Sequence, residues 1–531
     1  MRETSPAVAT GGMAATGHPL ATSAALEVLG ANGNAVDAAL AAAAVTWVVL
    51  PMMCGPGGDA FALVYDPRDG EVLGVGAGGM APAAATPEWF QERGHQLVPL
   101  DGPLSVGVPG AVGVLEELAQ RYGRLEFSDH FAAAIRLAER GHPVSGPAAR
   151  HFSTWASRLT ADPESSRIYG GVREGSVLVQ ADLARSIEAI ALGGARTLYH
   201  GPLGEAIASH LRQAGGLLTL DDLAAECVDV YDPPAVDYRG NRVFETAPPS
   251  QGFVVLEELQ IVENFDLASL PPDGDEAIHL LVEAKKLAVE DRNSRAGDPR
   301  FVEWDLEELL SAEHAAERAR LIDPDRSRTP QAVQAAPGDT TYLCVVDRDG
   351  MAVSLVHSLS TAFGAGVTVP GTGILLNNRV GRGFTLAPGH PNRLAPRKRT
   401  MSTLNCYLAT RNGKLALVGG TPGGDGQVQW NLQILSRILD HGQDPQAAVA
   451  APRWTHNPTT DPWRLSEPET LKVEQRVPQA TMEGLRRRGH PVQPVGPWDG
   501  GGSAQVIEVD SATGVLRGGS DPRGGGVALG R

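Results

Sequence analysis

The chain is poor in cysteine and in aromatic residues, and it contains no long apolar run. Its four cysteines lie far apart in 531 residues and form no CxxC pair, which excludes a disulfide scaffold and a zinc ribbon. We therefore expect all four to be buried thiols. The most apolar stretch covers residues 38–50 and ends at Pro51, so it is shorter than the roughly 20 residues of a membrane helix.

Positive charge is also scarce. The formal net charge is -17 at pH 7, and an acidic surface disfavours nucleic acid and anionic membranes as partners. The first residues, Met1 to Pro6, lack the basic segment followed by an apolar segment that a secretory signal requires. We therefore expect a cytoplasmic protein with neither a nucleic-acid nor a membrane partner.

The motifs of several common enzyme classes are missing. The sequence has no HExxH, GxSxG or GxxxxGK motif and no cluster of His, Cys and carboxylate residues at ligand spacing. The 14 histidines are scattered, and a lone histidine such as His357 is more typical of a packed residue than of a base. We expect neither a metal nor a cofactor.

The length and patterning indicate a globular α+β protein. A chain of 531 residues with 63 glycines and 39 prolines spread along it exceeds one simple core, so it forms two domains or one large elaborated domain. Apolar periodicity and turn residues predict helices and hairpins. The expected helices cover residues 21–29, 35–49, 278–295 and 427–439, and the expected hairpins cover residues 236–245 and 341–355.

The dipeptide Asp339-Thr340 has the features of a self-cleavage point. It follows a proline-rich stretch without apolar periodicity, residues 322–339, which is the one convincing tether in the chain. It precedes the strand expected from Thr340 onward. A threonine that becomes a chain terminus carries a hydroxyl nucleophile and an amine base on one residue. Taken alone, the same dipeptide is more typical of a strand edge.

A second candidate element is the glycine-rich stretch from Gly419 to Gly426, which precedes the helix expected at residues 427–439. Glycine amides at a helix N-terminus can stabilise an oxyanion or bind phosphate. A phosphate site is the weaker interpretation, because no lysine accompanies the loop. A candidate nucleophile and a candidate oxyanion hole in the same third of the chain together indicate an acyl-transfer enzyme.

Small hydroxyls and two arginines lie between these elements. The hydroxyl residues are Ser358, Ser360, Ser402 and Thr403, and each alone is also typical of a turn bond. Arg379 and Arg382 follow an Asn-Asn pair. They are either solvated surface charges or a fork for a substrate carboxylate.

With these residues in place, the chain resembles the γ-glutamyltransferase family of N-terminal-nucleophile hydrolases over nearly its full length, including its oxamate amidohydrolase-like branch. The specific match joins Asp339-Thr-Thr-Tyr342 to Thr421-Pro-Gly-Gly424. Further matching segments are Met80-Ala-Pro82, Asp237-Tyr-Arg-Gly240, Leu375-Leu-Asn-Asn378 and Gly519-Ser-Asp-Pro-Arg523.

The resemblance implies a four-layer αββα sandwich that is formed jointly by two subunits. Autocleavage between Asp339 and Thr340 would give a large, mostly helical subunit, residues 1–339, and a small catalytic subunit, residues 340–531, which remain associated. Thr340 Oγ would attack a small-molecule amide, and the amides of Gly423 and Gly424 would hold the oxyanion. Ser358 corresponds to a family hydroxyl that orients the new amine.

The departures from the family pattern concern the substrate. Family transpeptidases usually meet the γ-glutamyl ammonium and carboxylate with an acidic residue after the Asn-Asn pair and an arginine before Met-Ala-Pro. The corresponding positions here are Arg382 and Gly78, and Ser360 replaces an asparagine. An arginine at an ammonium site reverses an interaction of roughly 4 kcal/mol at about 4 Å and an effective dielectric constant of about 20.

We therefore expect an acyl group that carries a carboxylate but no ammonium, such as oxamyl or glutaryl. Arg379 and Arg382 would bind this carboxylate, with Ser360, Ser402 and Thr403 as added contacts. The alternative within the class is a genuine γ-glutamyl hydrolase or transpeptidase that acts on glutathione-like amides. The alternative from another class is a non-catalytic binding or scaffold homologue.

Overall fold

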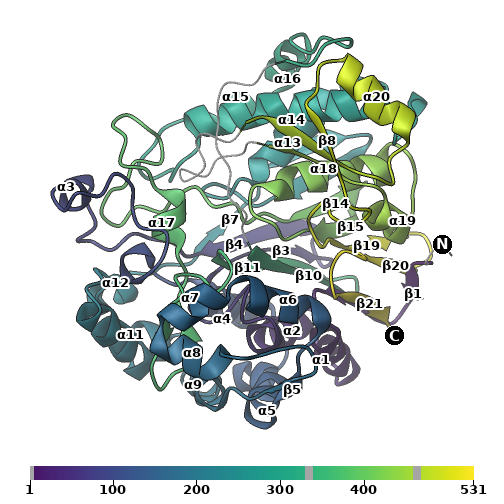
Figure 1. Cartoon of the computed structure of the whole chain (residues 1–531). Helices are drawn as coiled ribbons and strands as arrows, with labels where there is room; N and C mark the ends of the chain where they lie inside the picture. The colour runs from purple at the N-terminus through teal and green to yellow at the C-terminus, as the bar shows by residue number, and fades with distance from the viewer. Residues whose placement is uncertain (1–4, 329–338, 458–467) are drawn as a thin grey trace.

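Two seven-stranded sheets form the centre of the molecule (Figure 1). This computed structural model describes residues 5–328, 339–457 and 468–531. The first sheet has the order β21 (Val527–Gly530), β2 (Gly12–Thr16), β10 (Asp339–Asp347), β11 (Ala352–Ser360), β3 (Asp59–Asp66), β4 (Glu71–Ala77) and β7 (Asp229–Tyr231). The second has the order β1 (Ala7–Ala9), β20 (Leu516–Ser520), β19 (Gln505–Val509), β15 (Lys414–Gly420), β14 (Tyr407–Arg411), β9 (Asn241–Glu245) and β8 (Ala235–Tyr238).

Three hydrophobic cores separate four layers. Alternate side chains of a strand point to opposite faces of its sheet, and β10 follows this rule. Leu343 and Val345 pack against the helices that include α1 (Pro19–Gly30) and α2 (Ala35–Val49). Tyr342, Cys344 and Val346 instead pack between the two sheets. A third core lies between the second sheet and the helices α13 (Gly252–Val262), α14 (Asp275–Arg295) and α18 (Gly426–Leu439). The predicted αββα sandwich is confirmed.

The sequence accounts for the position of helix α2 directly. Asn34 and Asp37 form a capping box at its N-terminus, which satisfies amides that a helix otherwise leaves open. Every residue of the helix is buried, as its alanine-rich, apolar sequence predicts. The Asp37 carboxylate also lies 2.9 Å from Nε2 of His130, so this buried charge has a partner.

Both sheets contain strands from either side of Asp339-Thr340. β10 lies between β2 and β11, and the second sheet joins β14, β15, β19 and β20 to β1, β8 and β9. A break between Asp339 and Thr340 would fall after the first residue of β10 and leave the pairing of residues 341–347 with β11 and β2 in place. The structure describes the expected tether as far as residue 328. There the Ser327 amide donates a hydrogen bond of 2.6 Å to the Arg488 carbonyl. Residues 329–338 of that tether lie outside the described residues.

The structure also tests the expectations for the cysteines and for membrane-spanning helices. Cys54, Cys344 and Cys406 are buried, but Cys227 is exposed, so the prediction of four buried thiols is wrong for one. Cys227 lies in the irregular segment between α12 (Leu220–Ala224) and β7, where no regular element covers it. None of the helices in the described ranges has both the length and the apolar character needed to span a bilayer.

Candidate active site

Thr340 lies where the ladder between the two central strands is irregular. Asp339 pairs with Ser360 and Thr341 with His357, so the register shifts at Thr340. Such irregularities re-aim side chains and are frequent beside active sites. Thr340 is only 1% exposed, and its Oγ1 donates to Oγ of Ser358 at 3.2 Å. The neighbouring strand thus fixes the hydroxyl of the candidate nucleophile.

The Ser358 hydroxyl is itself held by the end of its own strand. Its Oγ accepts a hydrogen bond of 2.8 Å from the amide of Ser360. Ser360 has a φ of 86°, a left-handed conformation that side chains other than glycine rarely adopt. Such local strain is typical of functional sites. The Oγ of Ser360 is buried and has no hydrogen-bond partner in the described part of the chain.

Gly423 and Gly424 form the turn between β15 and α18. Their φ angles are 128° and 58°, and a Cβ at Gly423 would lie 2.1 Å from the Trp430 ring, so only glycine fits there. Within the ranges that the structure describes, neither glycine amide donates to a protein acceptor. Both precede the 14-residue helix α18, whose dipole favours negative charge at this end.

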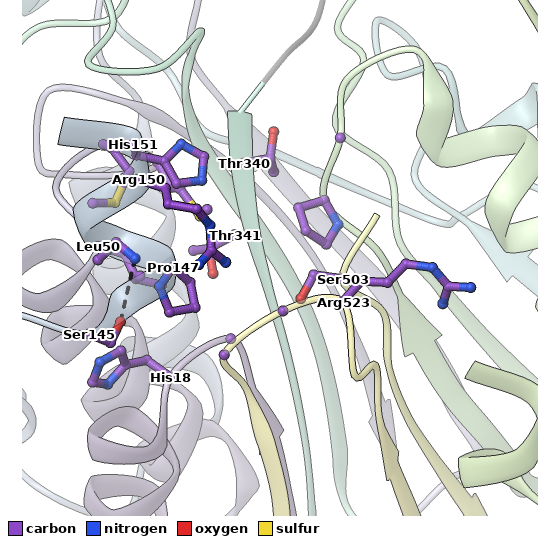
Figure 2. A pocket seen from close by; sticks show the side chains of 18 of the residues that line it. His18, Leu50, Ser145, Pro147, Arg150, His151, Thr340, Thr341, Ser503 and Arg523 are labelled. Carbon is purple, nitrogen blue, oxygen red and sulfur yellow. Dashed lines mark hydrogen bonds between the residues drawn. The ribbon is translucent and has the colours of Figure 1, made fainter. Parts of the chain in front are cut away.

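A cavity of about 500 Å³ connects the nucleophile to the glycine turn. Figure 2 shows Thr341 on the side of β10 toward helix α6 (Gly146–Thr154) and Thr340 on the other side of the strand end, with Ser503 and Arg523 across the cavity from α6. Of the predicted site residues, Thr340 and Gly423 line this cavity. The residues lining it do not include Ser358, Gly424, Ser360, Arg379, Arg382, Ser402 or Thr403.

Sequence analysis missed the far wall of the cavity. It consists of Met52, Met53, Pro147, Arg150, His151 and Trp155, together with His18 and Leu50. These residues belong to no motif, and helix α6 is an ordinary amphipathic helix in sequence. Arg523 lay within a segment that resembles the family, but nothing in that segment indicated a position near Thr340.

Arg379 is buried against Asp59. It lies on the short helix α17 (Arg379–Gly383), and its Nε donates to Oδ2 of Asp59 at 2.7 Å. A Cβ at Gly79 would lie 2.5 Å from Cγ of Arg379, and one at Gly78 would lie 2.3 Å from Oδ1 of Asp59. The two glycines therefore make room for this ion pair. Nη2 of Arg379 and Oδ1 of Asp59 have no hydrogen-bond partner among the described residues.

Arg382 connects the end of β11, which carries Ser358 and Ser360, to the turn of Gly423 and Gly424. Its Nη1 donates to the Ser360 carbonyl at 2.9 Å, and its Nη2 lies 3.9 Å from Oδ2 of Asp425. Asp425 also pairs with Arg292 at 3.0 Å. The side chains of Arg379 and Arg382 are 3% and 5% exposed, so the interpretation of these arginines as solvated surface charges is wrong. Burial requires the paired carboxylates that the distant segments supply.

Ser402 and Thr403 are attached to the same turn through Gln251. The Gln251 side-chain amide donates to the Thr403 carbonyl at 2.8 Å and to the Gly424 carbonyl at 3.2 Å. The Ser402 carbonyl accepts from the Gln251 backbone amide at 2.8 Å. Oγ1 of Thr403 is buried without a hydrogen-bond partner in the described ranges. The Thr403 hydroxyl is therefore available to a ligand near the turn of Gly423 and Gly424.

His357 packs on the helix side of the first sheet. Its Nδ1 accepts from Nε1 of Trp47 at 3.2 Å, and its Nε2 lies 3.1 Å from Oγ1 of Thr46. Burial lowers the pKa of His357 to about 3, so the ring is neutral at pH 7. It is a packed residue, as a lone histidine in a strand predicts.

This depressed pKa predicts a pH dependence of stability. Between the ordinary pKa of 6.5 and about 3, the unfolded chain binds a proton at His357 and the folded chain does not. Stability therefore falls as the pH falls through this window, by at most about 1.4 kcal/mol per pH unit from this residue. In His357→Gln the slope decreases by that amount. Urea unfolding at pH 4.5 to 7.0 measures it, and equal slopes would contradict the assignment.

The four layers, with Thr340 as the second residue of the central strand β10, match the architecture of an N-terminal-nucleophile hydrolase. The chain belongs to the γ-glutamyltranspeptidase family, because the model described as Gamma-glutamyltranspeptidase matches residues 21–531. It is therefore an amidohydrolase or acyltransferase of this type.

Several relatives are similar over their whole length. The chain is 38% identical to "Glutathione hydrolase-like YwrD proenzyme" of Bacillus subtilis, covering 98% of this chain and 99% of the relative. It is 35% identical to "Oxamate amidohydrolase proenzyme" of Klebsiella pneumoniae, with coverage of 98% and 99%. The crystal structure of cephalosporin acylase from Bacillus halodurans superposes with a TM-score of 0.93 at 36% identity, covering 100% of this chain and 98% of that chain. The word proenzyme in the first two names agrees with a family whose members are autoprocessed.

Proposed function

We propose that this chain is a self-processing amidohydrolase whose nucleophile is Thr340. The observation that carries the proposal is the contact of 3.2 Å between Thr340 Oγ1 and Ser358 Oγ at a cavity that Gly423 also lines. A hydroxyl nucleophile, a hydroxyl that orients it and open amides for an oxyanion are the parts that acyl transfer requires.

The first reaction is cleavage of the precursor. Thr340 Oγ attacks the carbonyl carbon of Asp339, the C–N bond breaks, and the freed nitrogen becomes the α-amine of Thr340. Water then hydrolyses the resulting ester and leaves a carboxylate on Asp339. The products are residues 1–339 and 340–531, which remain associated because both sheets contain strands from each part.

The second reaction is hydrolysis of an external amide. The α-amine of Thr340 accepts the proton of Oγ, and Oγ attacks the substrate carbonyl. The amides of Gly423 and Gly424 hold the negative oxygen of the tetrahedral intermediate. Ser358 orients the amine. The leaving amine takes the proton, and water or an acceptor amine then releases the acyl group from Thr340.

The charged side chains beside the end of β11 favour an acyl group that carries a carboxylate. Arg379, Arg382 and Arg292 bring three guanidinium groups to this region, where they pair with Asp59 and Asp425. A substrate carboxylate would offer these groups a further acceptor.

The polar atoms left open in this region suit the same ligand. Ser360 Oγ, Thr403 Oγ1 and Nη2 of Arg379 are buried and lack hydrogen-bond partners in the described ranges, and buried groups of this kind normally have one. We propose that they bind the acyl carboxylate, with Arg382 and Ser402 beside them. Gly78 and Gly79 make room for Arg379 and Asp59. The oxalyl group of oxamate and the glutaryl group both carry the required carboxylate, and two relatives are named oxamate amidohydrolase and acylase.

A donor panel tests the substrate assignment. We expect kcat/KM for oxamate or a glutaryl amide to exceed that for a γ-glutamyl anilide by at least about tenfold, because each charge-assisted hydrogen bond contributes about 1.5–3 kcal/mol. In Arg382→Gln this preference falls by about tenfold or more, whereas an uncharged butyryl amide reports any general loss of activity. A wild-type preference for the γ-glutamyl donor would overturn the assignment.

A γ-glutamyl donor is the second candidate. One relative is named glutathione hydrolase-like, and Oδ1 of Asp59 is buried without a hydrogen-bond partner in the described ranges. That oxygen is able to accept a hydrogen bond from the donor's ammonium group. Asp59→Asn would then reduce γ-glutamyl hydrolysis more than glutaryl hydrolysis.

A further inference from the structure

Three helices outside the candidate active site bring a histidine and two carboxylates together. Glu257 lies on α13, Asp291 on α14 and His314 on α16 (Ala312–Ala319), which belong to the helical layer over the second sheet (Figure 1). One potential ligand atom from each residue lies within 4.8 Å of the others. Nε2 of His314 is 3.5 Å from Oε1 of Glu257 and 3.4 Å from Oδ2 of Asp291.

These atoms are buried and unsatisfied. Glu257, Asp291 and His314 are 0%, 2% and 8% exposed. Both carboxylate oxygens of Glu257, Oδ2 of Asp291 and Nε2 of His314 have no hydrogen-bond partner among the described residues. Buried polar atoms are nearly always paired, and two adjacent buried carboxylates repel each other. A metal ion at the centre would give these atoms a partner and reduce the repulsion between the carboxylates.

Asp291 and His314 each have a charged neighbour on the outer side of the cluster. Oδ1 of Asp291 accepts a hydrogen bond from Arg318, so Oδ2 is left for the centre. Nδ1 of His314 lies 3.8 Å from Oε1 of Glu308. A carboxylate behind the second ring nitrogen is the usual support of a metal-bound histidine. These neighbours leave Oδ2 of Asp291 and Nε2 of His314 on the side that faces Glu257.

The spacing of the inner atoms matches a metal ion. Zinc binds histidine nitrogen and carboxylate oxygen at about 2.0–2.2 Å, so the ligand atoms of a tetrahedral site lie roughly 3.3–3.6 Å apart. The two distances from His314 Nε2, 3.5 and 3.4 Å, fall in this range. The imidazole ligand favours zinc, copper, iron or nickel over magnesium and calcium.

A second buried group differs because its histidine and carboxylate atoms have protein partners. It consists of His279, Glu283 and His490. His279 Nδ1 lies 2.8 Å from Nε2 of His490, and its Nε2 lies 2.8 Å from the Asp323 carbonyl. The Glu283 carboxylate accepts from Lys286 at 2.9 Å and from the Arg328 amide at 3.1 Å. Lys286 already provides the cation, so this group carries no metal site and serves as a control.

We propose that Glu257, Asp291 and His314 bind one divalent transition-metal ion, with water completing the coordination. The ion would join α13, α14 and α16. Asp291 is followed in α14 by Arg292, which pairs with Asp425 at 3.0 Å, the residue after Gly424. The site therefore supports the helix that holds the glycine turn, and its role is structural.

Zinc uptake tests this proposal on the full-length protein. The protein is stripped with a chelator, incubated with one equivalent of Zn²⁺, desalted and analysed for metal by mass spectrometry. We expect about one zinc per chain in the wild type and at least tenfold less in Glu257→Gln and His314→Gln. His279→Gln, from the control group, should retain wild-type uptake. Added Zn²⁺ should raise the melting temperature of the wild type and of His279→Gln only.

Cobalt gives a readout that does not depend on the variants. Co²⁺ in a site with these ligands is expected to produce visible d–d absorption, which Zn²⁺ should displace. The proposal is overturned if the stripped wild type takes up neither metal, which would leave a proton-sharing cluster of His314 with the carboxylates. Equal zinc uptake by the wild type and both site variants would also overturn it.

Discussion

Thr340→Ala yields a single intact polypeptide of 531 residues and no amide hydrolysis above background. Alanine has no hydroxyl to attack the Asp339 carbonyl, so the chain is not cleaved and no α-amine is released at this position. Loss of both nucleophile and base is expected to lower kcat/KM by at least about 10⁴-fold, as in other hydrolases that lose their nucleophile. A denaturing gel and a hydrolysis assay on one preparation measure both effects.

Thr340→Ser and Ser358→Ala are the matched controls. Serine keeps the hydroxyl, so cleavage proceeds, though more slowly because the γ-methyl group no longer restricts the rotamer. Ser358→Ala removes the partner of Thr340 Oγ1 at 3.2 Å and should slow cleavage without abolishing it. Cleavage between Asp339 and Thr340 in the alanine variant at position 340 would refute the assignment of the nucleophile.

Gly423→Ala should lower kcat by about 10²–10³-fold, the cost of losing one oxyanion donor. An added Cβ would lie 2.1 Å from the Trp430 ring, at a φ of 128°. Because the indole is packed, the turn must move, and the amides of Gly423 and Gly424 move with it. The half-time of precursor cleavage should lengthen as well, since both reactions pass through a tetrahedral oxyanion.

Gly442→Ala separates this effect from the general strain of a left-handed glycine. Gly442 has a φ of 63°, and a Cβ added there would meet nothing within 4 Å among the described residues. We expect a change in kcat of less than about twofold there, with at most a small loss of stability. A Gly423→Ala variant with wild-type kcat and cleavage rate would show that this turn does not hold the oxyanion.

Local pattern predicted much of the framework. The box formed by Asn34 and Asp37 begins the helix expected at residues 35–49. The alternation after Thr340 predicts the hairpin of β10 and β11, and the apolar spacing after Gly426 predicts α18. Each of these features depends on residues close together in the chain, so the sequence contains the information.

The surroundings of the nucleophile depend on distant pairs instead. Arg379 is separated from Asp59 by 320 positions. Local sequence periodicity cannot predict a contact between residues so far apart in the chain. The α6 wall of the cavity has ordinary helical composition for the same reason. The resemblance to a family supplied Ser358, but it did not supply Arg150 or Trp155.

The interleaved strands of the two sheets also determine how long a processed molecule lasts. Before cleavage, folding is unimolecular and its reversal leaves one chain that can fold again. After cleavage, neither segment alone holds a complete sheet, because β10 needs β2 from the other segment. Unfolding then separates two chains that must find each other by collision, so it becomes irreversible at low concentration. The lifetime of a cleaved molecule would therefore be governed by its rate of unfolding.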